Sequence, residues 1–81
     1  MSKTATKYAM DILDIIEQDW GKYSDLYSDI EYCVISWDDD EPQEMADSIK
    51  RVLEYYDISR ENNVKIWRLV SRIKNAIPVT E

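Results

Sequence analysis

A run of consecutive carboxylates near the middle of the chain is the strongest candidate for chemistry. It consists of Asp38, Asp39, Asp40 and Glu41, with Trp37 before it and Pro42 after it. Carboxylate oxygens bind divalent cations, and an EF-hand loop needs a glycine at its sixth position and a glutamate at its twelfth. In a loop that starts at Asp38, those positions hold Gln43 and Ile49. The spacing does not match, so we predict no metal site and no cofactor.

Histidine is missing from the chain, and glycine and cysteine occur once each. The absence of histidine and the single glycine exclude imidazole bases, imidazole metal sites and a glycine-rich phosphate loop. The only cysteine, Cys33, lies in an apolar segment without a basic neighbour, which favours a buried, inert thiol. Carboxylate pairs such as Asp14 with Glu17 would lie on the solvated side of a helix, where nothing gives them different roles. We therefore predict that the protein is not an enzyme and has no catalytic residues.

The charge of the chain is strongly uneven. The formal net charge is −7, yet residues 11–47 hold thirteen Asp and Glu against one Lys. Residues 60–81 instead hold five Lys and Arg against two Glu. The acidic part would repel the phosphates of nucleic acid and attract a basic protein surface.

The elements that position these charges are predicted to be helices, beginning with residues 4–20. Apolar side chains recur there at helical spacing, namely Ala5, Tyr8, Ala9, Ile12, Leu13, Ile15, Ile16 and Trp20. Ser2 or Thr4 can cap the start of this helix, and Gly21 is expected to adopt a left-handed conformation at its end.

The next segment has two interpretations. The residues Tyr23, Leu26, Tyr27, Ile30, Val34 and Trp37 repeat at helical spacing. Ser24 can cap this helix, and Ser28 could begin a second one after a break. Residues 31–37 are also rich in strand-favouring types and could form an irregular or strand-like segment. Because no other part of the chain offers a partner strand, we predict a helix.

Two further helices complete the predicted fold. Pro42 suits a first turn, and the third helix buries Met45, Ile49, Val52, Leu53 and Tyr56 before it ends near Asp57. Ser59 can cap a fourth helix that buries Val64, Ile66, Trp67, Leu69, Val70, Ile73 and Ile77 and ends before Pro78. We predict a single domain, residues 1–81, folded as an all-α compact bundle of four short antiparallel helices. No stretch is apolar enough to span a membrane, and we expect a cytoplasmic protein.

These features favour a small acidic module that binds a basic protein and inhibits it. The expected partner handles nucleic acid, as a nuclease does, while direct binding of nucleic acid or membrane by this module is not expected. The predicted binding residues are Asp25, Asp29, Trp37, Asp38, Asp39, Asp40, Glu41 and Tyr56. In size, charge and fold class the chain is similar to small acidic helical inhibitors, which include immunity proteins, phage anti-defence proteins and antitoxins.

Two alternatives remain open. The third and fourth helices could form a helix-turn-helix, which would present Arg60, Asn62, Asn63, Lys65 and Arg68 to DNA. Alternatively, exposed aromatic residues could be the interface of a structural homo-oligomer, whose oligomeric state the sequence does not specify.

Overall fold

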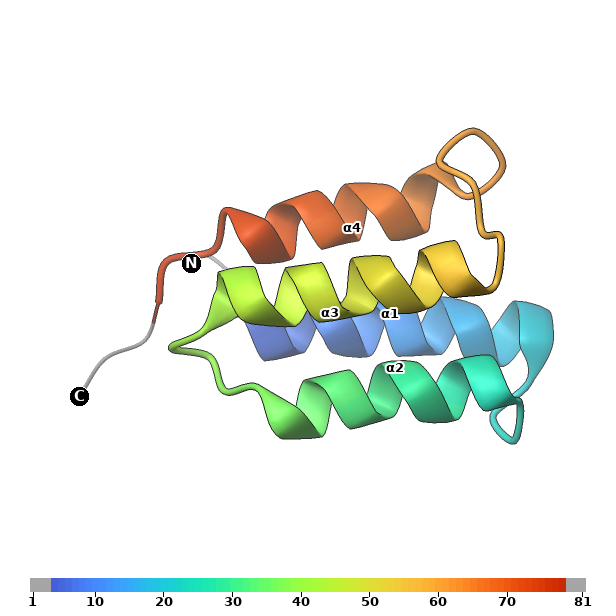
Figure 1. Ribbon diagram of the computed structural model, residues 1–81, viewed down its shortest axis with the longest axis horizontal. Coiled ribbons are helices and arrows are strands. Elements are labelled where there is room, and N and C mark those ends of the chain that lie inside the picture. The colour runs from blue at the N-terminus through green and yellow to red at the C-terminus, as the bar shows by residue number, and fades with distance from the viewer. Residues whose placement is uncertain (1–3, 79–81) are drawn as a thin grey trace.

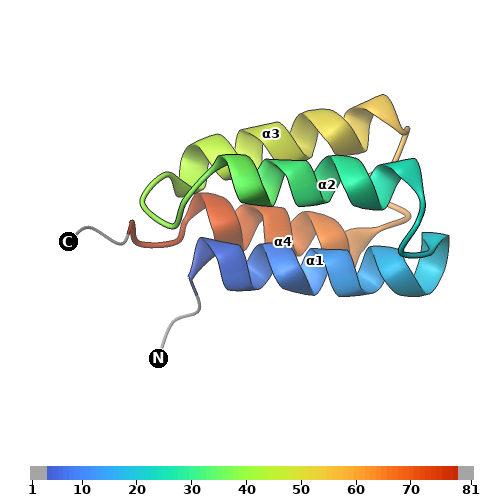
Figure 2. The same cartoon turned by 90° about the horizontal axis from the view of Figure 1, so that it is seen from below.

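The computed structural model describes residues 4–78, which form an all-α bundle of four helices (Figure 1). The helices are α1 (Ala5–Trp20), α2 (Asp25–Ser36), α3 (Pro42–Tyr55) and α4 (Val64–Lys74). Successive helices run antiparallel, and both α1 and α3 pack against α2 and α4 (Figures 1 and 2). The predicted four-helix bundle is therefore confirmed. In this ring α2 and α4 lie diagonally, on opposite sides of the molecule.

The core consists of the apolar stripes that the sequence predicts. Its largest fully buried side chains are Ile12, Ile16, Ile30, Met45, Ile49, Leu53, Ile66 and Ile73. Each contributes roughly 1.5–3 kcal/mol through removal of apolar surface from water. The predicted core residues that are instead exposed lie at or beyond helix ends, namely Trp20, Tyr23, Val64 and Ile77. The predictions for these four are wrong, because a side chain at the end of a bundle has fewer neighbouring helices to cover it.

Helix α2 is continuous, which settles the two interpretations of this segment in favour of helix. The Ser24 hydroxyl accepts a hydrogen bond from the Tyr27 N–H at 3.2 Å and caps its start. No break occurs at Ser28, and the strand-like alternative for residues 31–37 is wrong, because only Trp37 is extended. The helical conformation places Leu26, Ile30 and Cys33 on one buried side.

The ends of α1 follow the predicted signals with one difference. Thr4 caps the start, since its hydroxyl accepts a hydrogen bond from the Lys7 N–H at 3.3 Å; Ser2 lies outside the described residues. Gly21 has φ 95° and ψ 150°, a conformation of positive φ that is essentially restricted to glycine but is not the left-handed helical one. Its N–H donates to the carbonyls of Ile16 and Glu17.

The connection between α3 and α4 is longer than predicted. Ser59 does not cap α4; its hydroxyl accepts a hydrogen bond from the Asn62 N–H at 3.2 Å and closes a separate turn. Helix α4 begins only at Val64, after two asparagines, which are poor helix formers. Among residues 4–78, no helix combines the length and the apolar character needed to cross a membrane.

A Schellman motif ends α3. Asp57 has φ 58°, and its N–H donates to the Glu54 carbonyl at 3.1 Å. The N–H of Ile58 donates to the Leu53 carbonyl at 2.9 Å, and both of these apolar side chains are buried. The left-handed residue is an aspartate where glycine is usual, which costs conformational energy.

Candidate protein-binding surface

The acidic connection between α2 and α3 lies beside the N-termini of α1 and α3 (Figure 1). Within it, Asp39 is partly buried, and its Oδ1 atom accepts a hydrogen bond from the Thr6 N–H at 2.9 Å. This N–H is one of the first four of α1, which have no partner inside the helix. Asp38, Asp40 and Glu41 are exposed. Asp39 is therefore a structural cap for α1, whereas its three neighbours remain open to a partner.

Trp37 is held within the bundle. Its side chain is half-buried and packs against the core, and its Nε1–H donates to the Ser48 hydroxyl at 2.8 Å. The indole N–H, which a partner would otherwise engage, is thus used to connect the end of α2 to α3. The structure gives Trp37 a role in joining two helices.

Asp25, Asp29 and Tyr56 lie at the other end of α2. The Tyr56 hydroxyl donates a hydrogen bond to Oδ2 of Asp29 at 2.6 Å. This bond, followed by partial desolvation and the negative charges of Asp29 and Asp25, raises the pKa of Tyr56 to about 12 from its ordinary value of 10.0. The predicted pair of Asp29 and Tyr56 is therefore brought together, and the tyrosine is half-buried.

The predicted binding residues thus occupy two places on the molecule. The Asp29–Tyr56 and Trp37–Ser48 hydrogen bonds fix the antiparallel register of α2 and α3. Positions 29 and 37 are eight residues apart, which corresponds to about 12 Å along a helix. A partner that covers both places would also cover the side of α2 that lies between them.

Three large side chains on α2 and α3 are exposed although the sequence does not place them in the site. Tyr32 and Ile35 of α2 are 72% and 74% exposed, and Tyr55 of α3 is 81% exposed. The Tyr55 ring packs edge-on against Tyr56, with ring centroids 5.1 Å apart. Positions 32 and 35 lie off the stripe formed by Leu26, Ile30 and Cys33. A complete helical projection of the sequence would have identified them.

The acidic α2 and the basic α4 are arranged so that they do not neutralise each other. Helix α2 and the connection after it hold seven Asp and Glu and no Lys or Arg, whereas α4 holds four Lys and Arg and no acid. These two helices are diagonal in the bundle (Figure 1). The basic side chains Lys65, Arg68 and Arg72 instead share a hollow with Asp11 of α1. Internal complementarity with α4 therefore does not account for the acidic α2.

The arrangement of α3 and α4 differs from a helix-turn-helix. That motif joins two helices that cross at about 90–120° through a turn of 3–4 residues. Here α4 lies alongside α3 in antiparallel orientation, and residues 56–63 connect them (Figure 1). Arg60 and Asn62 lie in this connection and not on a recognition helix.

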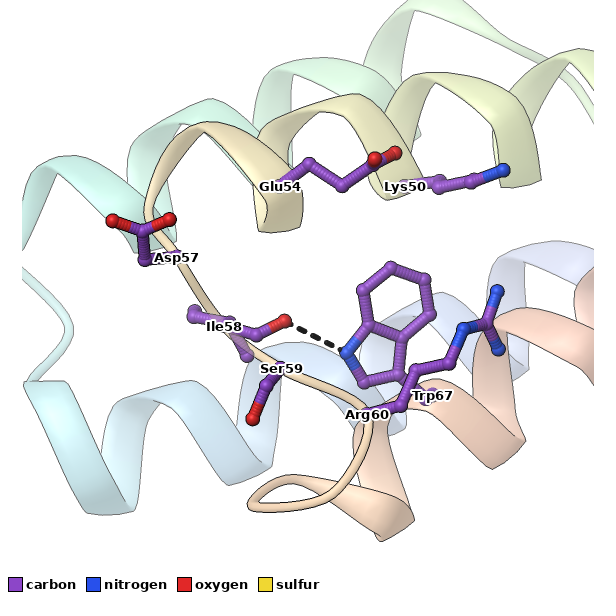
Figure 3. Close-up of a pocket in the computed structure, with 7 residues that line it drawn as sticks. All are labelled: Lys50, Glu54, Asp57, Ile58, Ser59, Arg60 and Trp67. Carbon is purple, nitrogen blue, oxygen red and sulfur yellow. Dashed lines mark hydrogen bonds between the residues drawn. The ribbon is translucent and has the colours of Figure 1, made fainter.

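A surface hollow of about 380 Å³ lies beside the α3–α4 connection (Figure 3). The Trp67 Nε1–H donates to the Ile58 carbonyl at 2.9 Å, and the Arg60 guanidinium lies 4.3 Å from the centre of the indole ring. Lys50 and Glu54 of α3 line the opposite side. These contacts hold the long connection against the bundle, which gives the hollow a structural explanation.

The interior of the bundle is apolar over residues 4–78. No polar or charged residue is buried there, and no three acidic or cysteine side chains are grouped so that they could hold a metal ion. Cys33 is buried, and desolvation, together with the charge of Asp29, raises the pKa of its thiol. The thiol therefore stays protonated and weakly nucleophilic.

No protein-family model matches this chain, and neither curated proteins nor solved structures include a significant match.

Proposed function

We propose that the protein binds a basic, nucleic-acid-handling protein, such as a nuclease, and inhibits it. The observation that supports this proposal is the position of the acidic charge: α2 and the connection after it lie on the side of the bundle diagonal to the basic α4. Carboxylates held on rigid helices present to a basic cleft the kind of charge that the cleft binds in nucleic-acid phosphates. Asp25 and Asp29, one helical turn apart, are examples.

The proposal predicts fast, salt-sensitive association with a basic protein. Electrostatic complementarity raises the association rate, and salt screens exposed charges over about 8 Å at physiological ionic strength. The same charges would oppose binding to DNA, RNA or anionic lipid. The proposal places the protein in the cytoplasm, where a free cysteine such as Cys33 is ordinary.

The test begins with a partner isolated from the source cell on the immobilised protein and then purified. The test variant carries Asp25→Asn, Asp29→Asn and Glu31→Gln on α2. A control variant has the same net charge but changes exposed acids elsewhere, through Asp14→Asn, Asp47→Asn and Glu61→Gln. We expect the first variant to lose at least about tenfold in affinity and the control to lose little.

The functional measurement is the partner's own nucleic-acid binding or cleavage. Wild-type protein should block it, and the α2 variant should not. Equal weakening by both variants, or a partner that still handles nucleic acid when saturated, would contradict the proposal. A mobility shift of DNA at low salt that Lys65→Ala abolishes would instead support the DNA-binding alternative.

A further inference from the structure

The exposed side chains Tyr32, Ile35 and Tyr55 form, with Asp25 and Asp29, a surface that we call the α2/α3 face. Tyr32 and Ile35 are three residues apart on α2, so they project from the same side of the helix. In the register fixed by the Asp29–Tyr56 hydrogen bond, Tyr55 lies at the level of residue 30, about 3 Å along the axis from Tyr32. Single exposed apolar residues are ordinary, but here three of them share two neighbouring helices with Asp25 and Asp29, and the hydrogen bond from Tyr56 holds Asp29 in place.

We propose that this face, and not the acidic connection alone, is where an arginine-bearing surface of the basic partner docks; this inference rests on the proposed function. Tyrosine rings attract a guanidinium group through their faces, and carboxylates bind it through paired hydrogen bonds. The hydrogen bond from Tyr56 holds Asp29 in place before binding. Ile35 supplies an apolar contact that a purely electrostatic site lacks.

The anchors assigned here differ from those predicted by the sequence. Trp37 donates its N–H to Ser48, and Tyr56 donates its hydroxyl to Asp29, so both are engaged within the bundle. On α2 and α3, Tyr32 and Tyr55 are aromatic side chains that remain mostly exposed. Aromatic residues of this kind dominate the binding energy of protein interfaces.

The charge and the size of the α2/α3 face both favour a protein as the molecule that binds there. The one basic side chain on α3 near Tyr55 is Arg51, and α2 has none, so the face is anionic and would repel nucleic acid. A second copy of this chain also carries a net charge of −7, which opposes self-association. The Cα extents of 36, 24 and 21 Å give one side an area of the order of 800 Å², comparable with each partner's share of a standard interface.

Two synthetic peptides of equal positive charge can test this assignment without the natural partner. One is an amphipathic helix bearing arginines and leucines, and in the other the leucines are replaced by serines. Titration calorimetry at about 50 mM salt should show at least about fivefold tighter binding of the leucine peptide. Backbone amide NMR shifts should concentrate in residues 28–36 and 51–56.

The decisive variant is Tyr32→Ser with Tyr55→Ser, which changes two exposed side chains and leaves the core intact. It should remove the preference for the leucine peptide, while Tyr23→Ser, at a position 95% exposed in the connection between α1 and α2, should preserve it. A persistent preference in the double variant, or shifts centred on residues 38–41, would overturn the assignment but leave the proposed function standing. If neither peptide binds, the proposed function fails as well. A dimer that the double variant dissociates in sedimentation would overturn the assignment in favour of a second copy.

Discussion

Replacement of Asp39 by alanine should destabilise the fold, although this residue lies in a run of surface acids. The change removes the acceptor of the 2.9 Å hydrogen bond from the Thr6 N–H and the negative charge beside the N-terminus of α1. A side-chain cap contributes about 0.5–2 kcal/mol, and a charge at a helix end contributes about 0.3–1 kcal/mol. Because the bond is partly exposed, we expect a loss of about 1–1.5 kcal/mol in the free energy of unfolding.

Urea denaturation followed by helical circular dichroism measures this change, and the matched controls are Asp38→Ala and Asp40→Ala. Both control residues are exposed, so their substitution should change stability by less than about 0.5 kcal/mol. In a thermal melt, Asp39→Ala should lower the midpoint by roughly 4–10 °C. Equal stability of the three variants would refute the capping role and would show that Asp39 behaves like its solvated neighbours.

Three further outcomes follow from individual contacts. Asp57→Gly should stabilise the protein by about 0.5–1 kcal/mol, because it relieves a positive φ and removes a negative charge from a helix C-terminus. Asp57→Val should destabilise it. Urea denaturation measures both changes, and effects of the opposite sign would contradict this explanation. The Tyr56 hydroxyl should ionise near pH 12, whereas ordinary tyrosines ionise near pH 10. The hydrogen bond to Asp29 therefore contributes fully to stability below pH 10, and this contribution is lost as the pH rises through 12. Spectroscopic titration of tyrosinate should lose this late step in Tyr56→Phe and show it at lower pH in Asp29→Asn; an unchanged titration curve would argue against the hydrogen bond. Cys33 should react slowly with a thiol reagent in the native protein and rapidly in urea, since burial raises its pKa, and equal rates would disprove its burial.

The helices could be predicted from the sequence because each has its own signal. Ser24 and Pro42 mark the starts of α2 and α3, and the apolar residues in between repeat at helical spacing. The start of α4 could not be placed correctly, because Ser59 has the chemistry of a cap but closes an isolated turn. Ile58 is buried, and its carbonyl accepts a hydrogen bond from the Trp67 Nε1–H, nine residues along the chain. These contacts hold that turn in place. The sequence pattern around Ser59 does not reveal a contact of this kind.

The candidate surface was only partly predictable for a related reason. The acids of α2 are visible in the sequence, but whether an aromatic residue anchors a partner depends on what else its polar group contacts. Trp37 and Tyr56 are engaged by Ser48 and Asp29, which lie 11 and 27 residues away. Asp39 is likewise indistinguishable from its neighbours until the chain brings it to Thr6, 33 residues away.

The amino-acid sequence by itself determined that this protein is a helical bundle with a concentrated negative charge and without histidine chemistry. These properties depend on composition and on spacing within one helix, which are local. Only the tertiary structure decided that the acidic α2 lies diagonal to the basic α4, that one acid of the central run caps α1, and that Tyr32 and Tyr55 stay exposed. Those outcomes depend on which helices pack together, because packing assigns each side chain either to a neighbour in the fold or to solvent.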